Sequence, residues 1–97
     1  MKYGFNRNAA PLFSMGQVFI TPGAMNVLTT EEANTFLYRH CHGDWGLVCA
    51  EDAEENWFSV QNGYRIMSVY ATYDGVAVWV ITEWDRSCTT ILLPEEY

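Results

Sequence analysis

The stretch that decides the fold is YRIMSVYATYDGVAVWVITEWDRSCTTILLP, which runs from Tyr64 to Pro94. It is rich in Tyr, Val, Ile and Thr, the residue types that favour strands. Asp74-Gly75 is a strong hairpin signal, and a second turn signal follows at Trp84–Ser87. The pattern predicts an antiparallel meander of three strands, at Tyr64–Tyr73, Val76–Glu83 and Cys88–Leu93.

Helix signals precede these strands. A Thr-Pro pair predicts a short helix over Pro22–Leu28, because Thr caps helices and Pro suits the first helical position. Thr29 and Glu32 have the spacing of a capping box, so a second helix is expected from Thr29 to about Gly43. A third helix is predicted over Leu47–Asn62, stopped by Gly63.

The expected fold class is therefore α+β, with two to three helices packed on a three- or four-stranded antiparallel β-meander. Met15–Ile20 supplies the fourth strand. Residues 15–97 are predicted to form this single domain, and Met1–Ser14 a flexible N-terminal arm. Trp45 is expected to act as an aromatic plug in the turn after the second helix.

Hydrophobic periodicity predicts which side chains face inward. The second helix presents a face made of Ala33, Phe36, Leu37, His40 and Cys41. The apolar stripe of the third helix is expected at Cys49, Ala53, Trp57 and Val60. Asn56 lies close to this stripe, so its amide needs a partner.

A two-residue turn at Asp74-Gly75 sets Tyr70 opposite Trp79 and assigns the two faces of the sheet. The core face then carries Met67, Val69, Ala71, Val78, Val80, Ile91 and Leu93. The opposite face carries Ile66, Tyr70, Trp79, Ile81 and Leu92. Since a sheet exposed on one side alternates more cleanly, this second face is expected to meet helices or another chain. Tyr70 and Trp79 are its predicted partner-binding residues, and a homodimer is one outcome.

The charge excludes several functions. Twelve acidic and five basic residues give a net charge of -7. Direct binding to nucleic acid or to an anionic membrane needs a Lys/Arg surface, so neither is expected. The longest uncharged stretch, Asn8 to Thr30, is broken by Pro and Gly and predicts no membrane span. The three cysteines are expected to be reduced thiols of a cytoplasmic protein.

Two groups of polar residues are candidates for metal binding or catalysis. His40-Cys41-His42 with Cys49 has soft metal ligands, but the spacing fits no closed zinc site, so no metal or cofactor is predicted. A structural polar cluster is predicted from His40, Asp44, Asn56, Glu83, Asp85 and Arg86. The alternative is a small enzyme or ligand-binding module that uses His40, Asp44, Asp85 and Arg86. No nucleophile elbow or phosphate loop is present, so no catalytic residue is assigned.

The third helix carries a run of acids, Glu51, Asp52, Glu54 and Glu55. A solvated helix face favoured by the helix N-terminus explains such a run. The functional interpretation is a surface like that of DNA, since acids one turn apart lie about 5–6 Å apart at Cβ. These four residues are therefore predicted to bind a partner.

Several segments also resemble a family of short bacterial proteins from plasmids, prophages and other mobile elements. The residues that carry this resemblance are Thr21–Ala24, His40–Gly46, Asp52–Asn56, Gly63–Arg65, Ser68–Tyr70, Trp79–Glu83, Asp85–Ser87 and Thr89–Tyr97. Members often bear a restriction–modification subunit label, yet the chain has no Gly-rich cofactor loop and no room for a methyltransferase. The resemblance covers residues 15–97 and implies a mobile-element context.

Small acidic proteins of such elements commonly inhibit host nucleases. The leading hypothesis is thus a non-enzymatic anti-CRISPR or anti-restriction inhibitor, whose partner is a host complex that targets nucleic acid. The alternatives are the ligand-binding module above and a dimeric interaction subunit.

Overall fold

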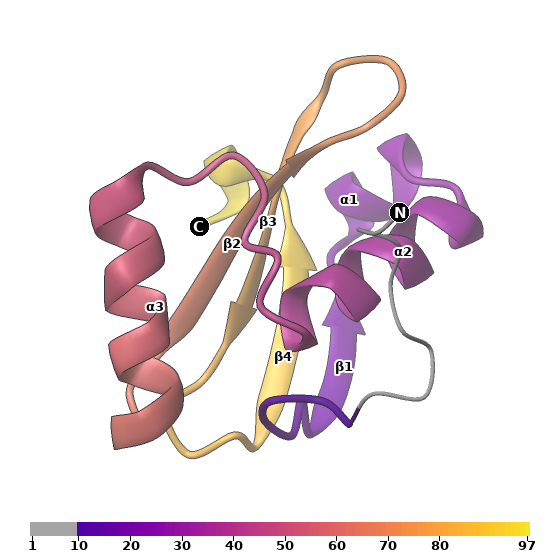
Figure 1. The fold of residues 1–97 in the computed structure, drawn as a ribbon. Coiled ribbons are helices and arrows are strands. Elements are labelled where there is room, and N and C mark those ends of the chain that lie inside the picture. Colours follow the sequence, from indigo (N-terminus) through magenta and orange to yellow (C-terminus); the bar gives the residue numbers. More distant parts are fainter. Residues whose placement is uncertain (1–9) are drawn as a thin grey trace.

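The computed structural model describes residues 10–97, and Figure 1 shows the path of the chain. The elements follow in this order: β1 (Gln17–Ile20), α1 (Pro22–Val27), α2 (Thr30–Cys41), α3 (Ala50–Asn62), β2 (Ile66–Ala71), β3 (Ala77–Thr82), β4 (Cys88–Leu92) and one short 3-10 turn, η1 (Pro94–Glu96). The chain is thus an α+β domain of three helices and a four-stranded sheet. The first nine residues of the predicted arm lie outside the described part.

The sheet is mixed, with the order β1-β4-β3-β2. β2, β3 and β4 form the predicted antiparallel meander, but β1 runs parallel to β4, so the prediction of a purely antiparallel sheet was wrong. A parallel neighbour needs a long crossover, and here the helices and two further strands intervene. β1 covers the outer edge of the apolar strand β4, a pairing that short-range turn signals do not encode.

The β2–β3 hairpin has a three-residue loop, and the predicted two-residue turn was wrong. Thr72 N donates to Val76 O at 2.9 Å, and Gly75, with φ of 82°, completes the loop in the left-handed region. Tyr70 consequently pairs with Val78, and Val69 pairs with Trp79.

This shift of one residue moves every side chain of β2 to the other face of the sheet. Ile66, Ser68 and Tyr70 face the core beside Val78 and Val80, opposite to the predicted face assignment. Trp79 and Leu92 do share the outer face, as predicted. β2 therefore contributes one serine and one tyrosine to the interior.

The core lies between the inner face of the sheet and the helices α1 and α2. Phe36 of α2 stacks on Tyr70 with ring centroids 4.7 Å apart. The predicted start signals are confirmed: Thr21 caps α1, and Thr29 with Glu32 forms a capping box on α2. The predicted inner face of α2 is confirmed as well, since Ala33, Phe36, His40 and Cys41 are buried. Trp45 is buried against Trp57, as the plug requires.

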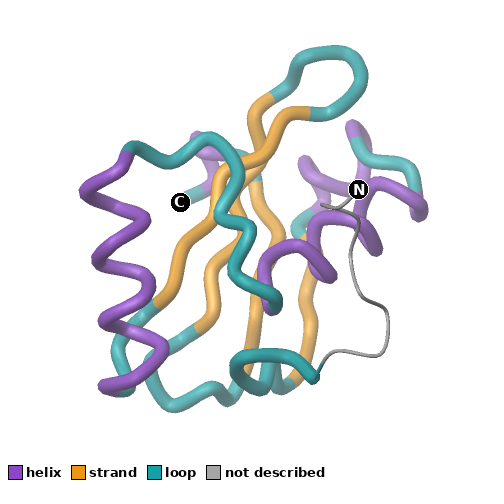
Figure 2. The backbone as a smooth tube through the Cα atoms, in the orientation of Figure 1, coloured by secondary structure: helices purple, strands orange, loops and turns teal. Residues whose placement is uncertain are grey.

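α3 stands beside the sheet and apart from the other two helices (Figure 2). It begins at Ala50 and not at Leu47, because Leu47 N donates to Val69 O at 2.7 Å and so belongs to the edge of β2. The predicted apolar stripe was wrong at Cys49 and Trp57, which are exposed. Asn56 and Ser59 are the buried residues of α3, since this helix docks on the polar edge of a strand.

The outer face of the sheet is partly covered by the C-terminus. Trp79 meets the Tyr97 ring edge-on at 5.6 Å, and η1 lies against β3. In residues 10–97, no helix combines the length and apolar character that crossing a membrane requires.

The register generates a direct stability test with two tyrosines of the same hairpin. Tyr70→Ala should lower the free energy of unfolding by about 3–5 kcal/mol, because it empties a core position. Tyr73→Ala should change it by no more than about 0.5 kcal/mol, because that ring is exposed. Urea unfolding measures both. The two-residue turn would place Tyr70 on the outer face, and a near-neutral Tyr70→Ala would support that register instead.

Candidate protein-binding surface

The acidic residues of α3 form an exposed face that the fold itself does not use. Glu51, Asp52, Glu54 and Glu55 are all exposed. Asn56, one turn after Asp52, anchors the helix: its Nδ2 donates to Met67 O at 2.8 Å, and its Oδ1 accepts from Met67 N at 3.2 Å. Since this amide satisfies the open edge of β2, α3 can be held in place without any contact from its carboxylates.

Helix electrostatics account for only half of these acids. Glu51 and Asp52 lie in the first turn of α3, where the positive end of the helix favours them. Glu54 and Glu55 lie beyond that turn and gain little from it. Neither ion pair of the described residues includes an α3 acid. Repulsion among these carboxylates is therefore reduced only by solvent ions or by a cationic partner.

A shallow hollow of about 210 Å³ lies between α3 and β2. Asp52 and Glu55 line it from the helix, and Arg65 lines it from the strand side. Arg65 is already engaged, because its Nη2 lies 3.3 Å from Glu83 Oε1 and its guanidinium covers the Tyr97 ring. The hollow thus continues the acidic face and also contains one guanidinium, which Glu83 shares.

Three exposed aromatic residues lie at the C-terminal end of α3 or in the turn that Arg86 ties to it, and we refer to Phe58, Tyr64 and Trp84 as the aromatic end. Phe58 and Tyr64 stack with centroids 5.8 Å apart. Trp84, in the turn between β3 and β4, is 65 % exposed. Sequence periodicity missed this group. The signal was present, since Phe58 lies outside the expected apolar stripe and Trp84 occupies a polar turn.

Arg86 joins the pieces that carry the aromatic end. Its guanidinium donates to Tyr64 O at 2.6 Å, to Ser59 O at 2.7 Å and to two carbonyls of its own turn. Its φ of 61° is unusual for a residue with a side chain and places the guanidinium over these acceptors. One cation therefore fixes the end of α3 against the β3–β4 turn.

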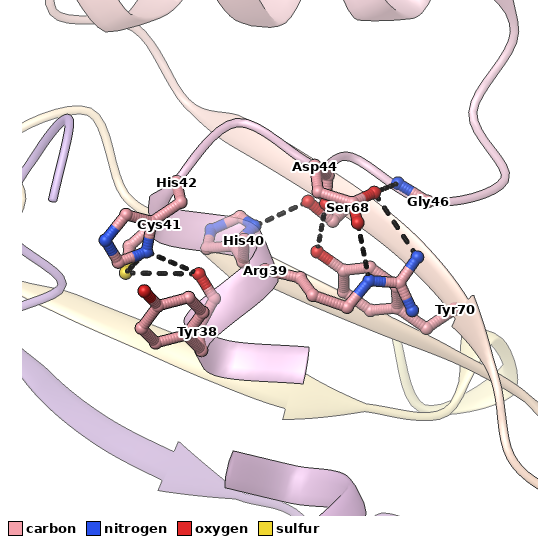
Figure 3. A network of polar contacts seen from close by, with 9 residues as sticks. All are labelled: Tyr38, Arg39, His40, Cys41, His42, Asp44, Gly46, Ser68 and Tyr70. Atoms are coloured by element: carbon pink, nitrogen blue, oxygen red, sulfur yellow. Dashed lines mark hydrogen bonds and ion pairs between the residues drawn. The ribbon is translucent and has the colours of Figure 1, made fainter. Parts of the chain in front are cut away.

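His40 is a buried structural residue within a chain of hydroxyl groups (Figure 3 shows its contact with Ser68). Its Nδ1 lies 2.6 Å from Ser68 Oγ, and its Nε2 lies 2.9 Å from Thr82 Oγ1. Thr82 in turn contacts Thr89 at 2.6 Å, and Thr89 donates to Met15 O at 2.8 Å. Burial, with a smaller contribution from Arg86, lowers the pKa of His40 to about 3.

The carbonyl of Met15 determines the direction of each hydrogen bond in this chain. It can only accept, so the Thr89 hydroxyl donates to it and must accept from Thr82. Thr82 then accepts from Nε2–H of His40, which leaves Nδ1 to accept from Ser68. The imidazole is neutral with its proton on Nε2, and every member is satisfied.

The other members of the predicted polar cluster hold separate parts of the fold. Asp44 pairs with Arg39 at 2.7 Å and accepts from Gly46 N, as Figure 3 shows. Glu83 pairs with Arg65, and Asp85 accepts from Ser87 N within its own turn. These side chains do not converge with His40 on a common hollow. In the described part of the chain, no three His, Cys, Asp or Glu side chains gather as a metal site would require.

Tyr70 and Trp79, the two predicted partner-binding aromatics, do not share a face. Tyr70 is 1 % exposed and its hydroxyl donates to Asp44 O at 2.6 Å. Desolvation raises the pKa of this phenol above its ordinary value. Trp79 lies on the outer face under Tyr97. Tyr70 therefore supports the core, and the aromatic end replaces it as the exposed aromatic surface.

Comparison with known proteins adds no relationship: no family model, no curated protein and no solved structure matches the chain.

The buried imidazole should make folding sensitive to mild acid. The unfolded chain binds a proton at His40 below about pH 6.5, whereas the folded chain resists protonation down to about pH 3. Because the unfolded state binds more protons in this window, stability should fall as the pH decreases, with a slope that grows from near zero above about pH 7 to about 1.4 kcal/mol per pH unit near about pH 5. Urea unfolding between about pH 7 and about pH 5 measures the slope above the range where carboxylates titrate.

His42→Gln is the matched control and should retain this slope, whereas His40→Gln should flatten it. A native chain whose unfolding free energy does not change over this range would show that His40 is not held neutral.

Proposed function

We propose that this protein is a non-enzymatic binder that blocks a nucleic-acid-targeting defence complex, of the anti-CRISPR or anti-restriction type. The observation that carries the proposal is the free acidic face of α3 beside the aromatic end. A complex that holds nucleic acid presents Lys and Arg to phosphates. An exposed helix with carboxylates at phosphate-like spacing offers those cations a competing ligand.

The internal use of cations strengthens this proposal. Three of the five basic residues belong to the described part, and each is occupied: Arg39 by Asp44, Arg65 by Glu83 and Arg86 by backbone carbonyls. Within residues 10–97, neither ion pair that these arginines form includes an α3 acid. The net charge of -7 is therefore available to steer the protein toward a basic channel.

The aromatic end supplies the second component that a stable interface needs. Charges set the encounter rate and orientation, whereas buried aromatic side chains carry most of the affinity. Phe58 is exposed on α3, and Trp84 is exposed in the turn that Arg86 ties to the end of this helix, so one partner can contact both components. The mobile-element context, expected from the resemblance of residues 15–97, agrees with a partner of the defence type.

Charge reversal on α3 tests the proposal in a DNA-cleavage assay with purified CRISPR effectors and restriction enzymes. The triple variant Glu51→Lys, Glu54→Lys, Glu55→Lys should raise the inhibitory concentration by roughly 100-fold or more, since repulsion replaces close charge pairs. The matched control reverses three exposed acids elsewhere, at Glu31, Asp74 and Glu95, and produces the same change in net charge. Equal loss in both variants would indicate a general charge effect, and unchanged inhibition in the α3 variant would refute the proposal.

Trp84→Ala tests the aromatic end separately. Loss of a central aromatic contact of about 2 kcal/mol should weaken binding by roughly 30-fold. Tyr73→Ala, which removes an exposed aromatic ring from the β2–β3 loop, should leave affinity unchanged. Binding is measured by calorimetry against the inhibited complex, and urea unfolding confirms that both variants fold. Equal affinities of the two variants would exclude the aromatic end from the interface.

A further inference from the structure

β1 is an open edge of the sheet. Gln17 N donates to Ser87 O at 3.0 Å, and Thr21 N donates to Ile91 O at 3.0 Å. Because alternate residues of a parallel strand bond to the neighbour, Val18 and Ile20 direct their N–H and C=O groups away from β4. No strand in residues 10–97 pairs with this side of β1. Within residues 10–97, four backbone polar groups thus have no strand beside them and can pair with an added strand.

The side chains around this edge are apolar and exposed. We define the β1 surface as Val18, Phe19, Ile20 and Met25, which are between 36 % and 65 % exposed. Natural edge strands are usually protected by charges, prolines or bulges. β1 has the sequence QVFI and contains none of these. An unprotected apolar edge is a template for pairing with another strand.

The charge distribution identifies the occupant. Asn8 to Thr30 contains no charged residue, although the chain as a whole carries -7. The nearby acid Glu96 is engaged by Thr21 Oγ1 and by Gly23 N. Two copies of so acidic a chain repel each other across most faces, and the β1 surface is where an equally acidic copy approaches without facing carboxylates.

We propose that β1 pairs antiparallel with β1 of a second copy, which gives a two-fold dimer with a sheet continuous across both chains. The self-complementary register sets Val18 opposite the partner's Ile20 and Phe19 opposite the partner's Phe19. It satisfies all four free backbone groups of each strand, and the two Phe19 Cα atoms lie about 4.5 Å apart in a non-hydrogen-bonded pair. β1 and β2 are opposite edges of the sheet, so this dimer leaves α3 free (Figure 1).

Light scattering on the full chain at increasing concentration tests the dimer. The native protein should show twice the mass of one chain, and Phe19→Lys should show the mass of one chain. Tyr73→Lys adds the same charge at an exposed site away from β1 and should remain dimeric. Urea unfolding verifies that each variant is folded. A monomeric native chain, or a dimer that survives Phe19→Lys, overturns the proposal; neither result affects the α3 assay.

Disulfide trapping tests the register. In a background with Cys49→Ser and Cys88→Ser, Phe19→Cys places two thiols across the two-fold axis within disulfide reach. Under mild oxidation it should form a covalent dimer roughly tenfold faster or more than Tyr73→Cys, because pairing raises the effective thiol concentration. Equal rates for the two variants overturn the proposed Phe19 pairing.

Discussion

A buried imidazole on α2 is hydrogen-bonded into a chain that reaches all three antiparallel strands. Ser68 comes from β2, Thr82 from β3 and Thr89 from β4, and the chain ends on the carbonyl that precedes β1. The Thr82 and Thr89 hydroxyls each donate and accept, and Ser68 donates to the imidazole, so the loss of one member leaves its neighbours unsatisfied in a buried site. This chain of hydrogen bonds therefore links three features: the rotation of α2, the register of the sheet and the neutral state of His40. A change in one of them would break the bonds that hold the other two.

This dependence explains why the local sequence pattern did not predict which side chains of the sheet face the core. Both faces are rich in apolar residues, so the hydrophobic alternation alone does not choose between two registers one residue apart. The turn signal at Asp74-Gly75 favoured a two-residue loop, which would place Ser68 and Thr82 on opposite faces. Only the observed register brings both to His40. Ser and Thr resemble solvent-facing residues in a sequence, so the decisive contacts had no hydrophobic signature.

Elements governed by short-range chemistry were predictable, and those governed by docking were not. The caps of α1 and α2 depend on residues within one turn, and they form as the sequence indicates. α3 is different, because its inner residues Asn56 and Ser59 meet strand backbone and a guanidinium instead of an apolar face. A search for an apolar stripe therefore placed Trp57 inside. The need of Asn56 for a partner was visible in the sequence, but its acceptor, the edge of β2, was not.

The two edge strands of the sheet differ in whether their outward backbone groups are hydrogen-bonded. At β2, the Asn56 amide and the Trp45–Leu47 segment occupy the open backbone groups. At β1, the corresponding groups of Val18 and Ile20 have no strand beside them in the described residues. The cations follow the same logic, since all three described arginines hold the fold together. Three surfaces contribute little to holding the described part of the fold together: the acidic face of α3, the aromatic end and the β1 surface. Clustered like charges repel one another, and exposed apolar area is unfavourable in water. A partner that covers these three surfaces would therefore gain the free energy that both effects cost the isolated chain.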